Sequence, residues 1–344
     1  MKRLSIGSNS FAGLQVSPVF DSYWRLAAER QSIFFKRIEG VRWPWTDDEI
    51  LQRHKFTNAY RASDRVSQYL IREVIYGKGL PNEPAEVIFR ILLFKLFNKI
   101  ETWKLLNREL GPVSWAEFST KRFSQVLARA HAKGHRIYSA AYIIPPVRGA
   151  GEAKHVGHLH LINQMMKGGI VRKIEDSATL SDVFWILKSY PSIGDFIAFQ
   201  LAIDINYSTV INHSEDEFVV AGPGARDGIS KCFLNYTEYA PEALIELMFD
   251  RQEMEFERLG ITFRSLWGRR LQLIDCQNLF CEISKYARVA HPEYLGIARR
   301  TRIKQIFRAN GTPLQPWYPP KWGLNTMVPQ PSATPESQQG SFAL

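Results

Sequence analysis

The sequence predicts a mainly α-helical fold, and three observations support that prediction. Eight segments have apolar residues at spacings of three and four, the pattern of helices with one buried face. Glycine or proline separates these segments, and only two short runs, "RIYSAAYII" and "EFVVAG", look like strands. With 45% hydrophobic and 12% aromatic residues among 344, the chain has the composition of a folded globular protein.

The predicted helices follow one another from residue 47 to residue 287. The first is expected to begin near Thr46, because "RWPWTDDEI" joins a proline, a hydroxyl residue and acids in the order common at helix starts. The expected ranges are 47–76, 84–109, 119–133, 153–167, 178–188, 194–205, 240–259 and 269–287. Irregular loops are expected near 136–152 and 206–230, and loops of that length often carry function.

Three regions are expected along the chain. Residues 1–45 mix aromatic and basic residues and are predicted to be an N-terminal extension that packs on the core. Residues 46–310 are predicted to form the helical domain. Residues 311–344 are rich in proline, serine and glutamine, so we expect no packed core there and disorder after about residue 325.

The net charge indicates what kind of partner the protein binds, and the cysteines indicate the redox state of its compartment. The net charge of +10 favours a polyanionic partner, because clustered lysine and arginine release counterions from a phosphate backbone. Cys232, Cys276 and Cys281 form no CxxC pair and leave an odd thiol, which favours a reducing compartment. The apolar run 87–97 contains two cations and is too short for a membrane span. We expect a cytoplasmic protein with no membrane contact and no obligatory protein partner.

The stretch "LKSYPSIGDFIA", residues 187–198, predicts two helices joined by a tight turn. Leu187 ends one helix, Pro191 stops it, and Gly194 permits the turn. Backbone N–H groups at the start of the second helix can hold a DNA phosphate without reading the base sequence. The expected contacts to the DNA backbone are Lys188, Ser192, Ile193 and Gly194. On spacing alone, an ordinary helix–turn–helix connection explains the stretch more often.

The same stretch resembles the helix-hairpin-helix of DNA glycosylases, whose pattern is Leu-x-x-Leu-Pro-Gly-x-Gly-x-x-x-Ala. Here Tyr190 replaces the second leucine and Ser192 replaces the first glycine. Those enzymes carry an essential aspartate beyond the hairpin, and Asp216 in "NHSEDEFVV" lies in the matching region. Phe196 stands where bifunctional members carry a lysine nucleophile, so the resemblance implies no lyase step through a Schiff base.

A wider resemblance covers residues 48–310. The stretches that carry it are "KFTNAYRASDRVSQYLI", "LLFKLFNKIETWKLL", "SIGDFIAFQLAIDINYS", "EDEFVVAGPGARDGISKCF" and "QNLFCEISKYARV". They resemble the glycosylase-related helical family of phage DNA base hypermodification, which includes the α-glutamyl/putrescinyl-thymine pyrophosphorylases and the helical domain of hydroxymethyluridine DNA kinases. This resemblance implies a bilobal, DNA-glycosylase-like helical fold with a cleft between its lobes. It also implies double-stranded DNA with modified bases as the partner.

Carboxylates are the expected catalytic groups. Breaking an N-glycosidic bond builds positive charge on the sugar, and a fixed carboxylate stabilises that charge. Asp216 is the preferred residue, with Glu217 and Glu215 as alternatives in the same run, Glu282 as a second acid and Asp204 as a further candidate. A solvated acidic run explains residues 215–217 as well.

A flipped base needs a wedge and a pocket, for which aromatic and hydrogen-bonding side chains are suited. The aromatic candidates are Phe56, Tyr60, Tyr142 and Tyr207, although aromatic residues at helical spacing are more often core. On a predicted helix over 55–71, Asn58, Arg61, Arg65 and Gln68 would form one polar stripe, and Asn58 and Arg61 are the expected pocket residues. A solvated helix face is the alternative explanation.

The stretch "AGPGARDGISKCF" is predicted to be a loop close to a DNA backbone, because its glycines and proline disfavour a helix. Gly222, Gly224 and Lys231 are the expected contacts there. Lys285 is a further expected phosphate contact, although its spacing from Glu282 also fits a surface ion pair. The stretch lacks the Gly-Lys-Ser/Thr ending of a nucleotide-binding P-loop.

No metal or cofactor is expected. His155, His158 and His160 in "HVGHLH" do not share one helix face, and no HExxH pattern is present.

These observations lead to three hypotheses. The first is a monofunctional DNA N-glycosylase that flips and excises a hydroxymethylated, glycosylated or otherwise hypermodified pyrimidine, leaving an abasic site, with antiphage defence as the role this activity suggests. The second is a base-hypermodification transferase acting on activated hydroxymethyluracil. The third is a non-catalytic protein that binds modified DNA.

Overall fold

The structure, a computed structural model, describes residues 13–140, 144–147, 153–309 and 314–329. Within these ranges the chain forms α-, 3-10 and π-helices together with isolated β-bridges, and no strand. The prediction of a mainly α-helical fold is therefore confirmed. The two runs that look like strands are irregular wherever the structure describes them.

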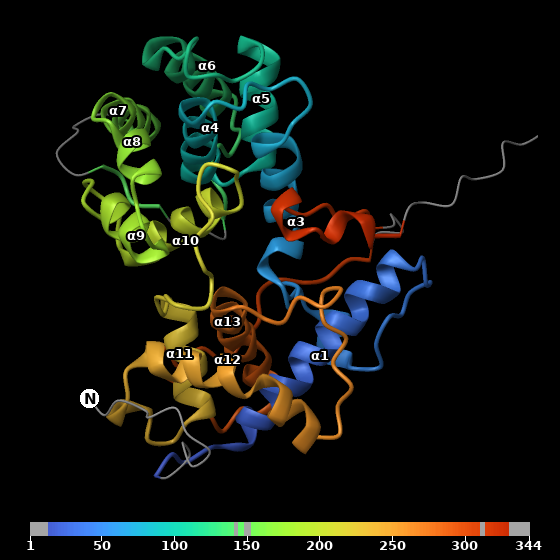
Figure 1. The fold of residues 1–344 in the computed structure, drawn as a ribbon. Coiled ribbons are helices and arrows are strands. Elements are labelled where there is room, and N and C mark those ends of the chain that lie inside the picture. The colour runs from blue at the N-terminus through green and yellow to red at the C-terminus, as the bar shows by residue number, and fades with distance from the viewer. Residues whose placement is uncertain (1–12, 141–143, 148–152, 310–313, 330–344) are drawn as a thin grey trace, which may run out of the picture.

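Figure 1 shows two groups of helices joined by irregular segments. The upper group consists of α4 (Pro84–Phe97), α5 (Ile100–Leu110), α6 (Thr120–Ala132), α7 (Lys154–Lys167), α8 (Ile170–Glu175), α9 (Leu180–Lys188) and α10 (Asp195–Asn206). The lower group consists of α1 (Pro18–Ile38), α11 (Pro223–Cys232), α12 (Pro241–Arg258) and α13 (Leu273–Ala290).

Helix α4 is the centre of the upper group. All of its residues from Glu86 to Phe97 are buried, because α5, α7, α8 and α10 pack around it. Its two cations bond to other parts of the protein. Arg90 donates to the carbonyl oxygens of Val74 and Pro81, each at 2.8 Å, and Lys95 forms an ion pair with Asp204 in α10. The helix predicted over 84–109 therefore starts at Pro84 as expected but is broken into α4 and α5, because Asn98 takes a left-handed conformation with φ of +47°.

Helices α11 and α13 pack so closely that glycine is required at their contact. A Cβ at Gly228 would clash with the carbonyl oxygen of Phe280, and one at Gly224 would lie 2.9 Å from Cys281 Sγ. The predicted loop over this stretch is wrong: Gly222 is the N-cap and Pro223 the first residue of α11. The contact between the two helices offsets the low helix propensity of the glycines.

Helix α1 was not predicted, although Ser17 as N-cap and Pro18 as first residue are an ordinary helix start. It buries Tyr23 and Trp24 in the lower group, where the Trp24 ring lies 5.2 Å from that of Phe256. Residues 18–38 therefore belong to the lower group.

The single helix predicted over 47–76 is wrong. The chain forms α2 (Glu49–Arg53), η1 (Arg61–Ser63), α3 (Arg65–Tyr69) and a π-helix, η2 (Leu70–Ile75). Residues 54–60 are not helical because their backbone groups bond elsewhere: the Thr57 N–H donates to Glu282 and the Asn58 N–H donates to Asp64. The predicted polar stripe on one helix therefore does not form.

Residues 314–329 pack between the two groups, where we expected no packed core. They include the 3-10 turns η4 (Pro320–Trp322) and η5 (Leu324–Thr326), and Tyr318 and Leu324 are buried. The Tyr318 hydroxyl lies 2.8 Å from that of Ser63, and Lys321 donates to the carbonyl oxygen of Ile211 at 2.8 Å. Residues 330–344 lie outside the described part of the chain.

None of the helices in the described ranges combines the length and apolar character needed to cross a bilayer.

Candidate functional site

The turn between α9 and α10 lies where the sequence predicted a hairpin. Helix α9 ends at Lys188, and Gly194 is the N-cap of α10. The left-handed residue of the turn is Ser192, with φ of +64°, whereas Gly194 is extended, with φ of −81° and ψ of 172°. The assignment of the tight turn to Gly194 is thus wrong. Gly194 is exposed, and a Cβ on it would have no atom within 4 Å.

The neighbours of Gly194 combine an apolar anchor with a half-buried cation. Ile193 is buried and fixes the turn to the core. Lys188 forms an ion pair with Asp195 at 2.6 Å, and its Nζ lies 4.6 Å from the ring centre of Trp185, a residue that is 57% exposed. The turn thus presents an aromatic ring, a cation and an open backbone on one edge of the upper group.

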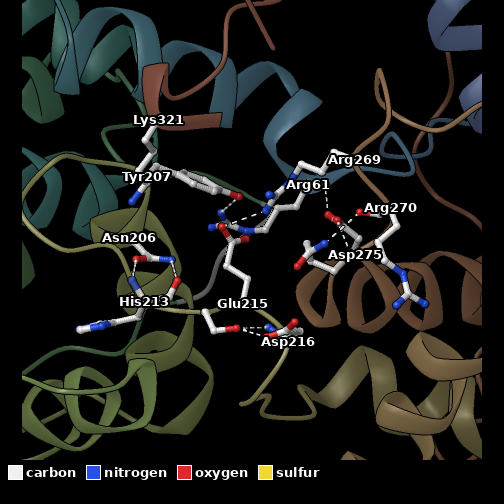
Figure 2. A network of polar contacts seen from close by, with 12 residues as sticks. Arg61, Asn206, Tyr207, His213, Glu215, Asp216, Arg269, Arg270, Asp275 and Lys321 are labelled. Carbon is white, nitrogen blue, oxygen red and sulfur yellow. Dashed lines mark hydrogen bonds and ion pairs between the residues drawn. The ribbon is translucent and has the colours of Figure 1, made fainter. Parts of the chain in front are cut away.

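In the segment after α10, the three consecutive acids 215–217 differ in burial. Asn206 and His213 close this segment with two reciprocal hydrogen bonds of 3.0 Å each (Figure 2). Asp216 and Glu217 are exposed, and Asp216 accepts a hydrogen bond from the Ser214 hydroxyl. Glu215 is buried and points toward the contact between the two groups.

Glu215 lies in a buried cluster of charges and rings. It forms an ion pair with Arg269 at 3.0 Å, and the Arg269 guanidinium lies 3.8 Å from the ring centre of Trp322. Burial raises the pKa of Glu215, while Arg269 and Lys321 oppose that rise. Burial lowers the pKa of Lys321 to about 8, against the attraction of Glu215. Sequence reasoning missed Arg269, Lys321 and Trp322, because they are distant in the chain and belong to no recognisable pattern.

Arg61 joins the two groups through a second buried network (Figure 2). Its guanidinium donates to Gln200 at 3.0 Å, Tyr207 at 3.0 Å and Asp204 at 2.6 Å. Its backbone N–H donates to Asp275 in α13 at 2.7 Å. All three guanidinium nitrogens thus bond to protein atoms, so Arg61 holds the upper group against the lower one.

The other predicted pocket residues are also engaged inside the protein. The Tyr60 hydroxyl donates to the Arg269 carbonyl at 2.6 Å, and Phe56 and Tyr207 are buried. Asn58 donates to the Ser63 carbonyl at 2.7 Å and accepts from Arg30 at 3.2 Å. Tyr142 lies outside the described residues. In this arrangement these side chains serve as core and loop supports.

Glu282 is buried beside the irregular segment 54–60. It accepts from the Thr57 N–H at 3.0 Å and forms an ion pair with Lys285 at 2.6 Å. Burial raises the pKa of the neighbouring Asp64 to about 7, and the Glu282 charge adds to that rise. Burial lowers the pKa of Arg30 to about 10, although Glu282 and Asp64 both oppose the change. This second acid therefore supports a loop.

Three of the predicted backbone contacts face the protein. A Cβ at Gly222 would lie 2.8 Å from the Phe196 ring, and Gly224 faces Cys281. Lys231 is 1% exposed and donates to the Ser284 carbonyl at 3.0 Å. The prediction that these three residues contact a DNA backbone is wrong, because helix packing takes up the glycines and burial removes the lysine from solvent.

His158, in α7, is held by two hydrogen bonds. His158 lies between the Tyr138 hydroxyl at 2.8 Å and the Pro145 carbonyl at 2.9 Å, and burial lowers its pKa to about 4. In the described ranges, no three histidine, cysteine, aspartate or glutamate residues are grouped as they would be around a metal ion.

A cavity of about 480 Å³ lies between α1 and α12. It is lined by Val16, Ser17, Pro18, Phe20, Asp21, Arg251, Glu255 and Arg258, none of which belongs to the clusters above.

Comparisons with known proteins identify related chains. The family described as "5-hmdU DNA kinase, helical domain" matches residues 17–296. A 5-hmdU DNA kinase of Bacillus phage SP10 is 24% identical over 291 residues, which are 78% of this chain and 45% of that relative. The chain therefore spans less than half the length of the relative it matches. No solved structure shows a significant match.

These matches overturn the first hypothesis. A kinase transfers a phosphoryl group and leaves the N-glycosidic bond intact, whereas a glycosylase hydrolyses that bond. The assignment of a monofunctional N-glycosylase, with Asp216, Glu217 or Glu282 as its catalytic acid, was wrong because the matching relative is a DNA kinase. The proposed role in antiphage defence depended on excision and is withdrawn with it.

Proposed function

This chain belongs to the 5-hmdU DNA kinase helical-domain family, and from that premise we propose that it binds DNA containing 5-hydroxymethyldeoxyuridine (5-hmdU). In this proposal the chain holds the modified base for a group transfer to its hydroxymethyl oxygen. The observation that carries the proposal is the family match over residues 17–296, which includes the α9–α10 turn and the segment that leads to Glu215.

The turn between α9 and α10 is our proposed contact to the DNA backbone. The open position at Gly194 leaves room for a phosphate at the start of α10, where backbone N–H groups and the helix dipole favour an anion. Ser192 lies two residues before this position, and Lys188 forms an ion pair with Asp195 directly after it. Such contacts fix the register of the duplex without reading its sequence, so base preference has to come from another part of the molecule.

The name of the phage relative favours a second candidate, in which this chain itself transfers the group. A phosphoryl transfer needs a cradle for the donor phosphates. The chain has no Gly-x-x-x-x-Gly-Lys-Ser/Thr run, so a P-loop is not the means by which it would hold them.

Fluorescence anisotropy with two labelled duplexes tests the proposal. The duplexes are identical except that one carries a single 5-hmdU in place of thymidine. We expect the 5-hmdU duplex to bind at least about fivefold more tightly, which corresponds to one added hydrogen-bonded contact. Equal affinities at several salt concentrations would contradict the proposal, because backbone contacts alone cannot distinguish the two bases.

Incubation of the same duplexes with γ-labelled ATP and Mg²⁺ tests the second candidate. Label on the 5-hmdU duplex alone supports transfer by this chain, and mass spectrometry of the nucleosides then gives the added group. A 5-hmdU preference without label supports the binding function.

A further inference from the structure

The segment that follows α13 is strongly basic. Residues 297–308, "IARRTRIKQIFR", contain five cations and no acid. The cations are Arg299, Arg300, Arg302, Lys304 and Arg308, and all five are exposed. We call residues 297–308 the basic strap. It lies beyond the residues matched by the family and outside the turn proposed above.

The basic strap is fixed to the protein at both ends. At its start, the Ala298 N–H donates to Asp227 at 2.6 Å, and Gly296, with φ of +66°, passes so close to Asp227 that a Cβ would lie 2.7 Å from its Oδ1. At its end, the Phe307 N–H donates to the Arg53 carbonyl and the Lys55 N–H donates to the Gln305 carbonyl, both at 3.0 Å. The strap is thus an ordered surface element.

The extended half of the strap has one inward and one outward face. Ile303 is buried and Phe307 is half-buried, whereas Arg302, Lys304 and Arg308 are exposed. Alternate residues of an extended chain point to opposite sides and repeat about every 6.6 Å. Outward cations at such intervals can follow an extended sugar-phosphate backbone.

The charges of the strap have no acidic partners in the described part of the chain. Its five cations form no ion pair there. Arg288 lies beside it and donates to the Arg302 carbonyl at 3.1 Å; burial lowers the pKa of Arg288, and the Arg300 charge adds to that effect.

The neighbouring segment 42–55 adds cations and a few acids. Arg42, Arg53 and Lys55 are exposed. The exposed acids near them are Asp47 and Glu49, while Asp48 caps α2 and accepts from the Tyr286 hydroxyl at 2.7 Å. The cations of this surface outnumber its acids, so it favours an anionic partner.

An exposed aromatic ring borders the strap. Trp43 is 40% exposed, and its ring centre lies 5.3 Å from that of Phe307, at an interplanar angle of 33°. Trp45 is buried beneath it, with ring centres 5.2 Å apart. Surfaces that bind unpaired nucleic acid combine a basic path with aromatic rings on which bases stack.

We propose that the basic strap, together with Arg42, Trp43, Arg53 and Lys55, binds the backbone of an unpaired DNA strand, with Trp43 stacking on one base. A base held outside the duplex leaves unpaired nucleotides around it, and this surface would hold such a strand. The inference rests on the proposed function only in taking DNA as the polyanion. It adds a second DNA contact, on the lower group, to the turn on the upper group.

The test uses the full chain and a labelled oligothymidylate of about 20 nucleotides, longer than the site of one binding fold. The variant is Arg300→Glu/Arg302→Glu/Lys304→Glu. The matched control is Lys121→Glu/Arg122→Glu/Arg129→Glu, three exposed cations on α6 at the far end of the upper group (Figure 1). We expect the strap variant to bind about tenfold or more weakly and its slope of log K against log salt to fall by about 2. The control is expected to match the wild type.

Trp43→Ala supplies a second variant that leaves the charges unchanged. We expect it to weaken binding of the oligothymidylate about fivefold or more and to leave the salt slope unchanged, because it removes stacking and no ionic contact. Trp43→Phe is expected to restore most of the affinity. Wild-type affinity in both the strap variant and Trp43→Ala would overturn the inference, and so would equal losses in the α6 control.

Binding measurements with duplex DNA distinguish this inference from the proposed function. If the strap variant loses affinity for thymidine duplex as strongly as for the oligothymidylate, and Trp43→Ala binds both normally, the unpaired-strand assignment is wrong. If the strap variant loses the oligothymidylate while wild-type protein does not distinguish 5-hmdU from thymidine, the proposed function fails and this inference stands.

Discussion

The Arg61 guanidinium lies 2.6 Å from Asp204 Oδ1, and both side chains are buried. Asp204 belongs to α10, and the Arg61 backbone N–H donates to Asp275 in α13. Arg61 therefore connects the C-terminal part of α10 to the lower group. Lys95 lies 2.8 Å from the other Asp204 oxygen, so two buried cations share one carboxylate.

Replacement of Arg61 tests whether this connection is structural. Arg61→Met should lower the free energy of unfolding by about 3 kcal/mol, because removing one partner of a buried ion pair leaves polar groups without compensation. Arg172→Met is the matched control, since the Arg172 side chain is 89% exposed, and its effect should stay within about 0.5 kcal/mol. Urea denaturation measures both. A loss below about 1 kcal/mol for Arg61→Met would contradict the assigned role.

The contact between α11 and α13 gives a ranked prediction. Gly228→Ala should destabilise the protein by about 2 kcal/mol or more, because its Cβ meets the backbone carbonyl of Phe280, which cannot move without shifting α13. Gly224→Ala should be milder, since its Cβ meets the Cys281 side chain, which can rotate. Thermal melts of the two variants measure the order. The reverse order would show that the helices do not cross at Gly228.

Gly194, in the turn between α9 and α10, should tolerate alanine, in contrast to Gly228. Gly194→Ala should change the free energy of unfolding by less than about 0.5 kcal/mol, because its φ of −81° suits alanine and its Cβ meets no atom within 4 Å. The same variant should weaken DNA binding, since the methyl group occupies the space proposed for a phosphate. Anisotropy with thymidine and 5-hmdU duplexes should show similar losses for both, as expected of a contact that does not read bases. Unchanged affinity in a folded variant would remove the turn from the proposed DNA contact.

The fold could be predicted from the sequence wherever local pattern and tertiary packing agree. Helix α4 is apolar over almost its whole length, and it begins where its pattern placed it, although the predicted range 84–109 is divided at Asn98. Helix α11 was missed because its glycines lower helix propensity, while the reason they are tolerated is a contact with α13, about 50 residues away. Residues 54–60 have a helical pattern, but the side chains of distant Glu282 and nearby Asp64 hold their backbone in another conformation.

The candidate site was predictable only in part, for a related reason. The position of the turn followed from Pro191 and Gly194, whereas the left-handed residue proved to be Ser192. Three consecutive acids in an irregular segment have no periodicity that tells which one is buried, and Glu215 is the buried one. Its partners Arg269 and Lys321 come from segments that only the folded chain brings together.

Asp64 should make stability depend on pH. Its pKa is raised from an ordinary 3.8 to about 7 when folded, chiefly by burial and further by the Glu282 charge, while Arg30 opposes the rise. Between about pH 4 and pH 7 the folded state therefore binds more protons than the unfolded state, so this group lowers the free energy of unfolding as pH rises. Asp64→Asn removes that loss and keeps an oxygen to accept from the Asn58 N–H.

Urea denaturation across this pH range should show Asp64→Asn gaining stability relative to wild type as pH rises. Asp176→Asn, whose side chain is 69% exposed, is the control for losing one negative charge. If the free energy of unfolding of Asp64→Asn relative to wild type stays constant or falls as pH rises, Asp64 ionises as readily in the folded chain as in the unfolded one.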